Sequence, residues 1–379
     1  YKRQANNVTF SGSFTEFVGG ISTSERIYAP SNVQSSINIT GTDVGYFSFG
    51  GRRLDFAGAE SLYGSNLEDT ITLEDGSQWN GYIYALNGND QFIVPGNASA
   101  TWLDGDGGTD TITGPNFNNT WRLLSRDRVL LNSQIEFRET ESVVSGPGDD
   151  TFEFTGSSSI YLSGTLDLGD GRDTLDYSEY TSNVLVSWRT NRASGVGGSS
   201  YGGAFGNTTN FDAVVGRNSA SDRVEGPDTV NQWLVTDANV GNINSGQYTF
   251  SGFGSITGGT EEDVLLIESG GSLTGGVSFS TNDRIELADR GVPLEVNAVT
   301  RRVTDVIGAN SFAGAIVFQG TADNRLIGGT SSLSLFLNAD GSATANNVIF
   351  SGSFTEFVGG TSTSERIYAP SNVPVSYTH

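Results

Sequence analysis

Three groups of acidic and amide side chains are candidate ligands for a cation. Each lies in or beside a Gly-rich stretch, and Ca²⁺ takes six to eight oxygen ligands from carboxylates, amides and carbonyls. The groups are Asp104, Asp106 and Asp110; Asp167, Asp170 and Asp173; and Asn87, Asn89 and Asp90. Asp and Asn also cap tight turns through side-chain to backbone hydrogen bonds. We favour this turn-capping interpretation, which requires no cofactor, and keep calcium as the alternative.

Other site chemistry has few candidate residues. The chain contains no cysteine, so disulfides, thiolate metal sites and a Cys nucleophile are excluded. Its single histidine is His379 and its single lysine is Lys2. Carboxylate pairs such as Asp149 and Asp150 are abundant, which makes each pair a weak sign of the convergent acid and base that catalysis needs. We therefore predict a protein that is not an enzyme and keep an enzyme acting on polysaccharides as the least favoured alternative.

A short pattern recurs along the chain: an acidic or amide residue, any residue, then an apolar residue. We call the first residue the anchor. The anchors are Glu25, Asp69, Asp90, Asp110, Asp150, Asp173, Asp222, Asp263, Asp283, Asn324 and Glu365. The fourth residue after the anchor is often apolar too, as at Leu73, Val94 and Phe154. Alternation with period two indicates a half-buried strand, and the Gly-rich stretches before the anchors indicate turns.

The spacing between anchors takes only certain values. Successive anchors stand near one or two multiples of about 20–24 residues apart. A solenoid with one coil per interval explains this spacing, whereas a hairpin meander does not. We predict an all-β fold, a right-handed parallel β-helix (β-solenoid) with about 20–24 residues per coil and about 16 coils per 340 residues.

The two ends of the chain carry nearly the same segment. Residues 5–33 return as 345–373 at an offset of 340 residues, with 27 of 29 positions identical and differences at Thr9/Ile349 and Ile21/Thr361. Long repeat periods indicate arrays. We predict one continuous β-solenoid over residues 1–379, in which 5–344 form one repeat unit and 345–379 begin the next. Weaker internal sub-blocks lie near 113–154, 225–267 and 327–367, marked by Trp121, Trp233 and Leu335.

Composition limits the partners. The net charge of −23 argues against nucleic acid, whose phosphates need a basic face. The apolar runs are only a few residues long, so we expect no membrane span. A solenoid end is an unpaired strand edge, and the partner that fits it best is the protein itself.

Three strings resemble the repeats of giant bacterial cell-surface proteins. They are LDGDGGTDTITG (103–114), VVSGPGDDTFEF (143–154) and LDLGDGRDTLDYSEY (166–180). They are similar to RTX-like or haemagglutinin-like β-helix proteins of the adhesin or filament type. The resemblance implies an exported parallel β-helix at the bacterial cell surface that serves in adhesion, biofilm matrix or filament formation. RTX rolls repeat a Gly/Asp nonapeptide in tandem, whereas here single copies stand about 20 residues apart.

These observations predict an acidic structural protein outside the cell. We expect the repeat unit of an extracellular filament or giant surface protein, which stacks coil on coil and head to tail with copies of itself. The units are either covalently continuous or docked. The alternative is the stalk or glycan-binding part of a bacterial adhesin, with surface glycans as partners.

Overall fold

The computed structural model describes residues 16–19, 25–310, 312, 314–319, 324–328, 333–346, 348–352, 354–360 and 366–368. These residues form strands and turns, and none of them lies in a helix. The all-β class expected from the sequence is therefore confirmed. The anchor Glu365 and the substituted positions Thr9, Ile21 and Thr361 lie outside the described residues.

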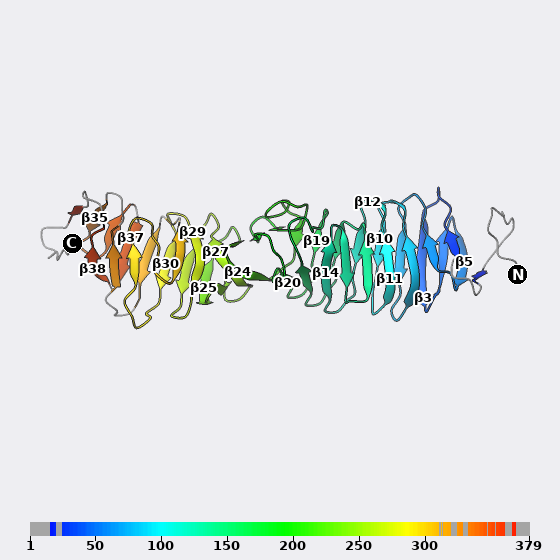
Figure 1. Cartoon of the computed structure of the whole chain (residues 1–379), viewed down its shortest axis with the longest axis horizontal. Coiled ribbons are helices and arrows are strands. Elements are labelled where there is room, and N and C mark those ends of the chain that lie inside the picture. The colour runs from blue at the N-terminus through cyan, green and yellow to red at the C-terminus, as the bar shows by residue number, and fades with distance from the viewer. Residues whose placement is uncertain are drawn as a thin grey trace. The chain divides into compact units, whose positions relative to one another are not determined.

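The chain forms two compact units, Tyr1–Trp121 with Ser125–Pro147 and Arg122–Leu124 with Gly148–His379. The continuity of one solenoid over residues 1–379 stays a prediction, so we describe each unit by itself. The strands of the first unit lie side by side in the blue-to-green part of Figure 1. They are β1 (Glu16–Val18), β2 (Arg26–Tyr28), β3 (Ser35–Gly41), β4 (Val44–Phe49), β5 (Arg52–Ala57), β6 (Ser61–Tyr63), β7 (Thr70–Leu73), β8 (Gln78–Tyr84), β9 (Asn87–Gly88), β10 (Gln91–Ile93), β11 (Ser99–Asp104), β12 (Gly107–Gly108), β13 (Thr111–Thr113), β14 (Thr120–Ser125, which has residues in both units), β15 (Arg128–Leu131), β16 (Ile135–Arg138) and β17 (Ser142–Val144).

Two parallel ladders build the first unit. In one ladder, β3, β7, β10, β13 and β17 pair in register through a column of apolar residues, Ile37, Ile71, Phe92, Ile112 and Val143. In the other, β2, β6, β8, β11 and β16 pair through Ile27, Leu62, Ile83, Leu103 and Phe137. Both columns are buried, and the rings of Phe92 and Phe137 join them at 5.7 Å. The core of this unit thus lies between its two ladders.

The second unit is built on the same principle. Its strands are β18 (Thr151–Phe154), β19 (Leu166–Asp167), β20 (Thr174–Asp176), β21 (Leu185–Ser187), β22 (Arg192–Ala193), β23 (Thr208–Thr209), β24 (Ala213–Glu225), β25 (Gln232–Asp237), β26 (Val240–Ile243), β27 (Tyr248–Thr257), β28 (Val264–Ile267), β29 (Leu273–Ser278), β30 (Arg284–Leu287), β31 (Glu295–Asn297), β32 (Ile307–Asn310), β33 (Ala315–Phe318), β34 (Asn324–Ile327), β35 (Ser334–Leu337), β36 (Ala343–Ala345), β37 (Val348–Gly352), β38 (Phe354–Val358) and β39 (Arg366–Tyr368). One of its buried parallel columns is Trp233, Leu265, Ile285, Ile316 and Phe350.

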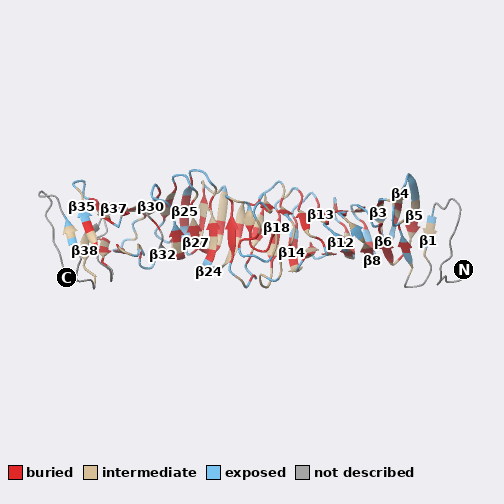
Figure 2. Ribbon diagram, turned by 90° about the horizontal axis from the view of Figure 1, so that it is seen from above, coloured by how far each residue is buried: buried red, intermediate tan, exposed pale blue. Residues whose placement is uncertain are grey.

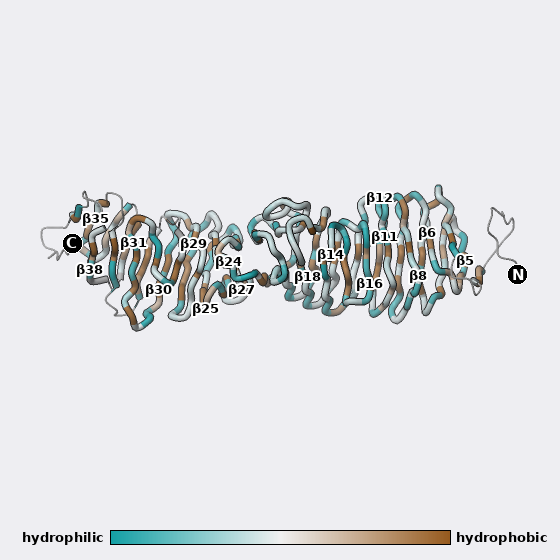
Figure 3. Tube along the Cα trace, viewed as in Figure 1, coloured by the Kyte–Doolittle hydropathy of each residue, from teal (hydrophilic) through white to brown (hydrophobic). Residues whose placement is uncertain are grey.

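The alternation predicted from the sequence is visible along these strands. The strand Gln78–Tyr84, for example, alternates between exposed and buried residues over six of its seven positions. Buried positions recur along the ribbon in Figure 2, and apolar and polar segments alternate along the tube in Figure 3. Period two therefore marks the inward face of each strand.

The step between parallel partners is less regular than expected. Thr70, Gln91 and Thr111 are successive partners in one ladder, and their separation in sequence matches the predicted coil. The next step, from Thr111 to Ser142, is half as long again, and the step from Thr174 to Ala213 is almost twice as long. The even coil length predicted from the anchors is therefore wrong, and the predicted repeat unit holds fewer than sixteen steps.

Antiparallel hairpins account for many of the long steps. Strand β15 pairs antiparallel with β16, and β26 pairs antiparallel with both β25 and β27. Because these hairpins stand between parallel partners, they lengthen the step beyond the predicted coil.

The first two internal sub-blocks share a local structure. At the start of the first, the Thr120 N–H donates to Asn132 Oδ1 at 2.8 Å. At the corresponding place in the second, the Gln232 N–H donates to Asn244 Oδ1 at 2.9 Å. The following residues, Trp121 and Trp233, are both buried.

Candidate functional site

The anchors form the most unusual polar feature of the molecule, because their side chains point inward. Nine of them are at most 2 % exposed: Asp69, Asp90, Asp110, Asp150, Asp173, Asp222, Asp263, Asp283 and Asn324. In a strand, residues two apart share a face. An anchor therefore shares its face with the buried apolar residues at its second and fourth positions. This parity was present in the sequence and places the anchors inside rather than on the turns.

Eight of the nine buried anchors accept a hydrogen bond from a backbone N–H at the preceding step. Asp90 Oδ1 accepts a hydrogen bond from the Asp69 N–H at 2.6 Å, and Asp110 Oδ1 accepts one from the Asp90 N–H at 2.7 Å. The same contact joins Asp173 Oδ1 to the Asp150 N–H at 2.8 Å. A buried backbone N–H needs a partner. The anchors thus extend the ladder by one hydrogen bond at the place where each strand begins.

Three acidic residues that the sequence pattern did not include fill the same position. Glu141 Oε2 accepts from the Asp110 N–H at 2.7 Å, and Asp212 Oδ2 from the Asp173 N–H at 3.1 Å. Glu60 Oε2 accepts from the Glu25 N–H at 2.6 Å.

These three residues carry the sequence signal of an anchor. Each is followed two residues later by an apolar residue, Val143, Val214 or Leu62. They were missed because the long intervals were interpreted as two coils. Glu60, and not Asp69, is the partner of Glu25, so the anchors belong to different ladders.

The anchors are of two kinds, according to whether the second carboxylate oxygen has a hydrogen-bond partner. Asp263 Oδ2 accepts from the Gly259 N–H of its own turn at 2.8 Å, and Asp69 Oδ2 accepts from the Ser65 N–H of its turn. Within the described residues, the Oδ2 atoms of Asp90, Asp110 and Asp173 are buried without a hydrogen-bond partner.

Burial raises the pKa of these three carboxyl groups. Desolvation raises the pKa of Asp90 to about 6, and nearby carboxylates, Asp69 and Glu68, add to the shift. Desolvation likewise raises the pKa of Asp110 and of Asp173 to about 7. A low-dielectric environment disfavours the charged form of a carboxyl group. These groups therefore titrate near neutral pH.

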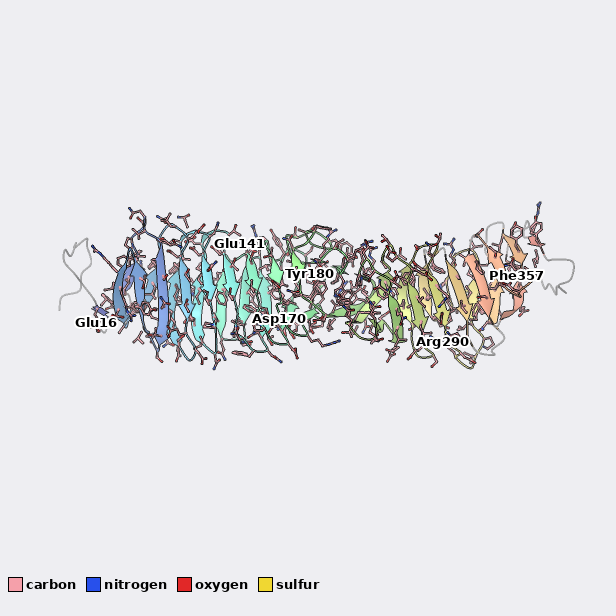
Figure 4. The ribbon with its side chains drawn as sticks, turned by 180° about the vertical axis from the view of Figure 1, so that it is seen from behind. Glu16, Glu141, Asp170, Tyr180, Arg290 and Phe357 are labelled. Carbon is pink, nitrogen blue, oxygen red and sulfur yellow. The ribbon has the colours of Figure 1, made fainter. Side chains whose placement is uncertain are left out.

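The two Asp groups predicted as cation ligands are split between the interior and the surface. Asp110 points inward, while Asp104 Oδ1 caps its own turn by accepting from the N–H of the exposed Asp106 at 3.2 Å. Likewise Asp173 points inward and Asp170 is exposed. Figure 4 shows the side chains of these turns, with Glu141 and Asp170 labelled.

The remaining members of the predicted groups make turn and cross-turn hydrogen bonds. Asp167 Oδ1 accepts from the Gly169 N–H at 3.2 Å and from Asn210 Nδ2 at 2.7 Å. Asn87 Nδ2 donates to Asn66 Oδ1 at 3.1 Å, Asn89 Oδ1 accepts from the Thr109 N–H at 2.9 Å, and Asp90 points inward.

The structure therefore gives the predicted cation residues hydrogen-bonding roles at several positions. Over the described ranges, no three His, Cys, Asp or Glu side chains are grouped so that they could hold a metal. Calcium binding stays a prediction.

A column of aromatic rings occupies the outer face of the first unit. Tyr28 stacks on Tyr63 with ring centroids 4.2 Å apart, and Tyr63 stacks on Tyr84 at 4.7 Å. Trp102 continues the column edge-on to Tyr84 at 5.0 Å, and the Arg138 guanidinium lies 4.4 Å from the Trp102 ring. These side chains lie on the strand face opposite the buried column from Ile27 to Phe137.

Comparison with protein-family models and with curated proteins finds no match for this chain. Among the described residues there is also no helix with the length and apolar character that crossing a membrane requires.

Proposed function

We propose that this chain is a right-handed parallel β-helix and the structural repeat unit of an extracellular filament or giant surface protein. The observation that carries the proposal is the in-register apolar column. Strand after parallel strand places the same kind of residue at the next step, as from Ile37 to Val143. In such an arrangement each step buries its apolar face only against its neighbours, so the structure can extend without a new kind of core.

The duplicated segment supports the same proposal. The near-identity of residues 5–33 and 345–373 is the sequence pattern of an array. The net charge of −23 suits an extended surface that stays soluble by repelling its neighbours. The role is structural: hydrogen bonds between successive strands and a continuous apolar interior hold the unit together.

Electron microscopy of native surface material tests this function. We expect filaments with an axial repeat below about 75–80 Å per unit, because fewer than sixteen steps of about 4.8 Å fit in one unit. Antibodies against the chain should decorate these filaments at that interval. Labelling confined to short surface stalks without an axial repeat would contradict the proposal.

The aromatic column favours a second candidate, the stalk or glycan-binding part of an adhesin. Aromatic rings in a row can stack on sugars, and Tyr82, 39 % exposed, packs beside Trp102 at 4.6 Å. We place this function second because rings that stack on one another offer mainly their edges to a ligand.

A glycan-binding assay separates the second candidate from the first. If the column binds sugars, Trp102→Ala lowers binding at least tenfold, while Tyr201→Ala, at an exposed tyrosine outside the column, leaves it unchanged. Glycan binding by neither wild type nor variant is the result that we expect for a filament unit. Incubation with acidic polysaccharides should likewise release no product, since we propose a role without catalysis.

A further inference from the structure

The duplicated segment occurs twice in the structure with different neighbours. In its first copy, β1 pairs with β5 and β2 pairs with β6, which follow in sequence. In its second copy, β38 pairs with β34 and β39 pairs with β35, which precede it. The described strands of the two copies, 16–18 with 26–28 and 356–358 with 366–368, have identical sequences. One sequence therefore accepts neighbours on either side.

The backbone shows that these neighbours use opposite edges. In the first copy, the Ala29 N–H donates to the Tyr63 carbonyl at 2.8 Å. In the second copy, the Arg366 N–H donates to the Leu333 carbonyl at 2.8 Å, and Arg366 is the counterpart of Arg26. Odd and even positions of a strand direct their backbone groups to opposite edges. One copy of this strand can therefore be hydrogen-bonded along both edges at once.

The other strand of the segment follows the same rule. The Gly19 N–H donates to the Ala57 carbonyl at 2.7 Å. In the second copy, the carbonyl of Val358, the counterpart of Val18, accepts from the Gly328 N–H at 2.7 Å. Both strands thus have one edge for the earlier neighbour and one for the later neighbour.

The side chains of the two copies are buried in a complementary way. Phe357 is 7 % exposed in the second copy, whereas its counterpart Phe17 is only half-buried. Conversely, Ile27 is 8 % exposed and its counterpart Ile367 is half-buried. Each copy buries the apolar residue that the other leaves partly open. Figure 4 labels Glu16, in the first described strand of its unit, and Phe357, in one of the last described strands of the other.

The aromatic rings repeat this complementarity. Tyr28 stacks on Tyr63, which follows it, with the planes 12° apart. Its counterpart Tyr368 stacks on Phe336, which precedes it, at 4.7 Å with the planes 9° apart. Tyr28 is 57 % exposed and Tyr368 43 % exposed. A single tyrosine at this position can be covered on both ring faces.

We propose that a second copy of this chain binds at this segment by strand exchange. Strand residues 356–358 and 366–368 of one molecule replace 16–18 and 26–28 of the next, so that they pair with β34 and β35 of their own chain and with β5 and β6 of the neighbour. The inference rests on the proposed head-to-tail function and names the joint that makes it. Because the donating and accepting ends differ, the contact is heterologous, and each molecule that joins offers a further end to the next one.

The exchange leaves the number of paired strand edges unchanged. The displaced copy and the incoming copy have the same strand sequences, so the incoming copy restores the pairing with β5 and β6. The incoming copy also covers its second edge, which buries Ile367 and the open ring face of Tyr368. An unpaired strand edge is a template for pairing with another chain, and here the matching strand is already in the sequence.

Cysteine crosslinking tests the exchange, since the chain has no cysteine of its own. Molecules carrying Tyr63→Cys are mixed with molecules carrying Tyr368→Cys under mild oxidation. Exchange places position 368 beside position 63 of the neighbour, and parallel neighbours at about 4.8 Å lie within disulfide reach. We expect a disulfide-linked pair of chains, and no such pair when Tyr201→Cys replaces Tyr63→Cys. A disulfide between Tyr28→Cys and Tyr368→Cys would instead overturn the exchange. It would show that the two molecules meet end to end while the first copy keeps its own place.

Sedimentation of the full chain at rising concentration provides an independent test. We expect oligomers that grow with concentration for the wild type and for Ile27→Asp, which alters only the displaced copy. Ile367→Asp alters the donated copy and should reduce association at least tenfold. Circular dichroism is the check that both variants fold. Tyr28→Ala and Tyr368→Ala form a milder matched pair at exposed positions.

Two results would overturn the exchange. One is equal loss of association in Ile27→Asp and Ile367→Asp, and the other is a wild type that stays monomeric at all concentrations. Either result leaves the proposed function to be decided by the axial repeat of native filaments, because covalently continuous units need no exchange.

Discussion

At the scale of single residues, the anchor carboxyls combine two opposing effects. One oxygen holds a backbone N–H of the neighbouring strand, as Asp110 Oδ1 holds the Asp90 N–H. The other oxygen of Asp90, Asp110 and Asp173 is buried without a hydrogen-bond partner among the described residues. A charged oxygen in this position is costly, which raises the pKa of these carboxyls.

The first prediction concerns the pH dependence of stability. The folded-state pKa values of Asp90, at about 6, and of Asp110 and Asp173, at about 7, lie above the unfolded value near 3.9. The folded state therefore binds protons more tightly. This contribution to the free energy of unfolding is fully present below about pH 4 and is lost as the pH rises through 6 to 7.

Urea unfolding at pH 5 and at pH 8 measures this effect. We expect the free energy of unfolding to be higher at pH 5, with each unit of pKa shift worth about 1.4 kcal/mol. Glu136 acts in the opposite sense, because hydrogen bonding to Arg128 lowers its pKa. A protein that is less stable at pH 5 than at pH 8 would show that such ion pairs dominate instead.

The second prediction concerns a substitution at one anchor. The chain already uses an amide at Asn231, where Nδ2 donates to the Pro227 carbonyl at 2.9 Å while the backbone N–H donates to Asp263 Oδ1. Asp110→Asn keeps an oxygen for the Asp90 N–H and removes the buried charge. We expect it to raise the free energy of unfolding at pH 8 by about 1–3 kcal/mol and to weaken the pH dependence. The exposed Asp170→Asn is the control and should leave both unchanged.

The sequence indicated these residues but not their orientation. Asp90, Asp110 and Asp173 were selected as oxygen donors on turns, and a Gly-rich turn before an Asp is compatible with either direction of the side chain. Which direction is taken depends on the strand that lies alongside, since its N–H is the partner. That neighbour is distant in sequence and is not specified by the local pattern.

At the scale of elements, the Gly-rich turns let successive strands approach closely. In β12, Gly108 has a φ of 153°, and a Cβ built there would lie 1.4 Å from the Gly88 carbonyl oxygen of β9. In contrast, Gly76 has a φ of 75° but nothing within 4 Å of such a Cβ. A substitution at Gly76 therefore tests backbone strain alone, whereas one at Gly108 tests strain together with the close approach of two turns.

The third prediction uses this pair. Gly76→Ala should cost on the order of 1 kcal/mol, because a residue with a side chain is strained in a left-handed backbone conformation. Gly108→Ala should cost at least 2 kcal/mol more, on the order of the loss expected when packed backbone must move apart. Thermal unfolding of both variants measures the difference. Equal losses in the two variants would mean that the turns do not need to touch.

The elements themselves were predictable to different degrees. Period-two alternation after anchors such as Asp69 and Asp263 identified β7 and β28 and their inward faces. The pairing of strands was not predictable, because the sequence after Asp110 fits either short steps or one longer step to Glu141 that contains a hairpin. Only the antiparallel pairing of β15 with β16 decides for the hairpin.

At the scale of the whole molecule, the fourth prediction concerns calcium. The oxygens of Asp104, Asp167 and Asn89 are already engaged by backbone N–H groups or by an amide. We therefore expect the melting temperature to change by less than about 1 °C, equivalent to under about 1 kcal/mol, when a chelator replaces excess Ca²⁺. A larger rise with Ca²⁺ would support the calcium alternative, and Asp106→Asn with Asp170→Asn would locate the ion.

The unequal steps also bear on how such a chain can vary over time. A step with an inserted hairpin and a step without one both bring the next strand to the same ladder, as the short and the long step on either side of β13 show. Residues gained or lost at a hairpin tip, such as positions 245 and 246 between β26 and β27, leave the paired strands in register. The ladder of paired strands and the hairpins inserted into it can therefore change independently. A lineage could alter the surface it presents to its surroundings by insertion alone, and a designer could graft a foreign peptide at the same place.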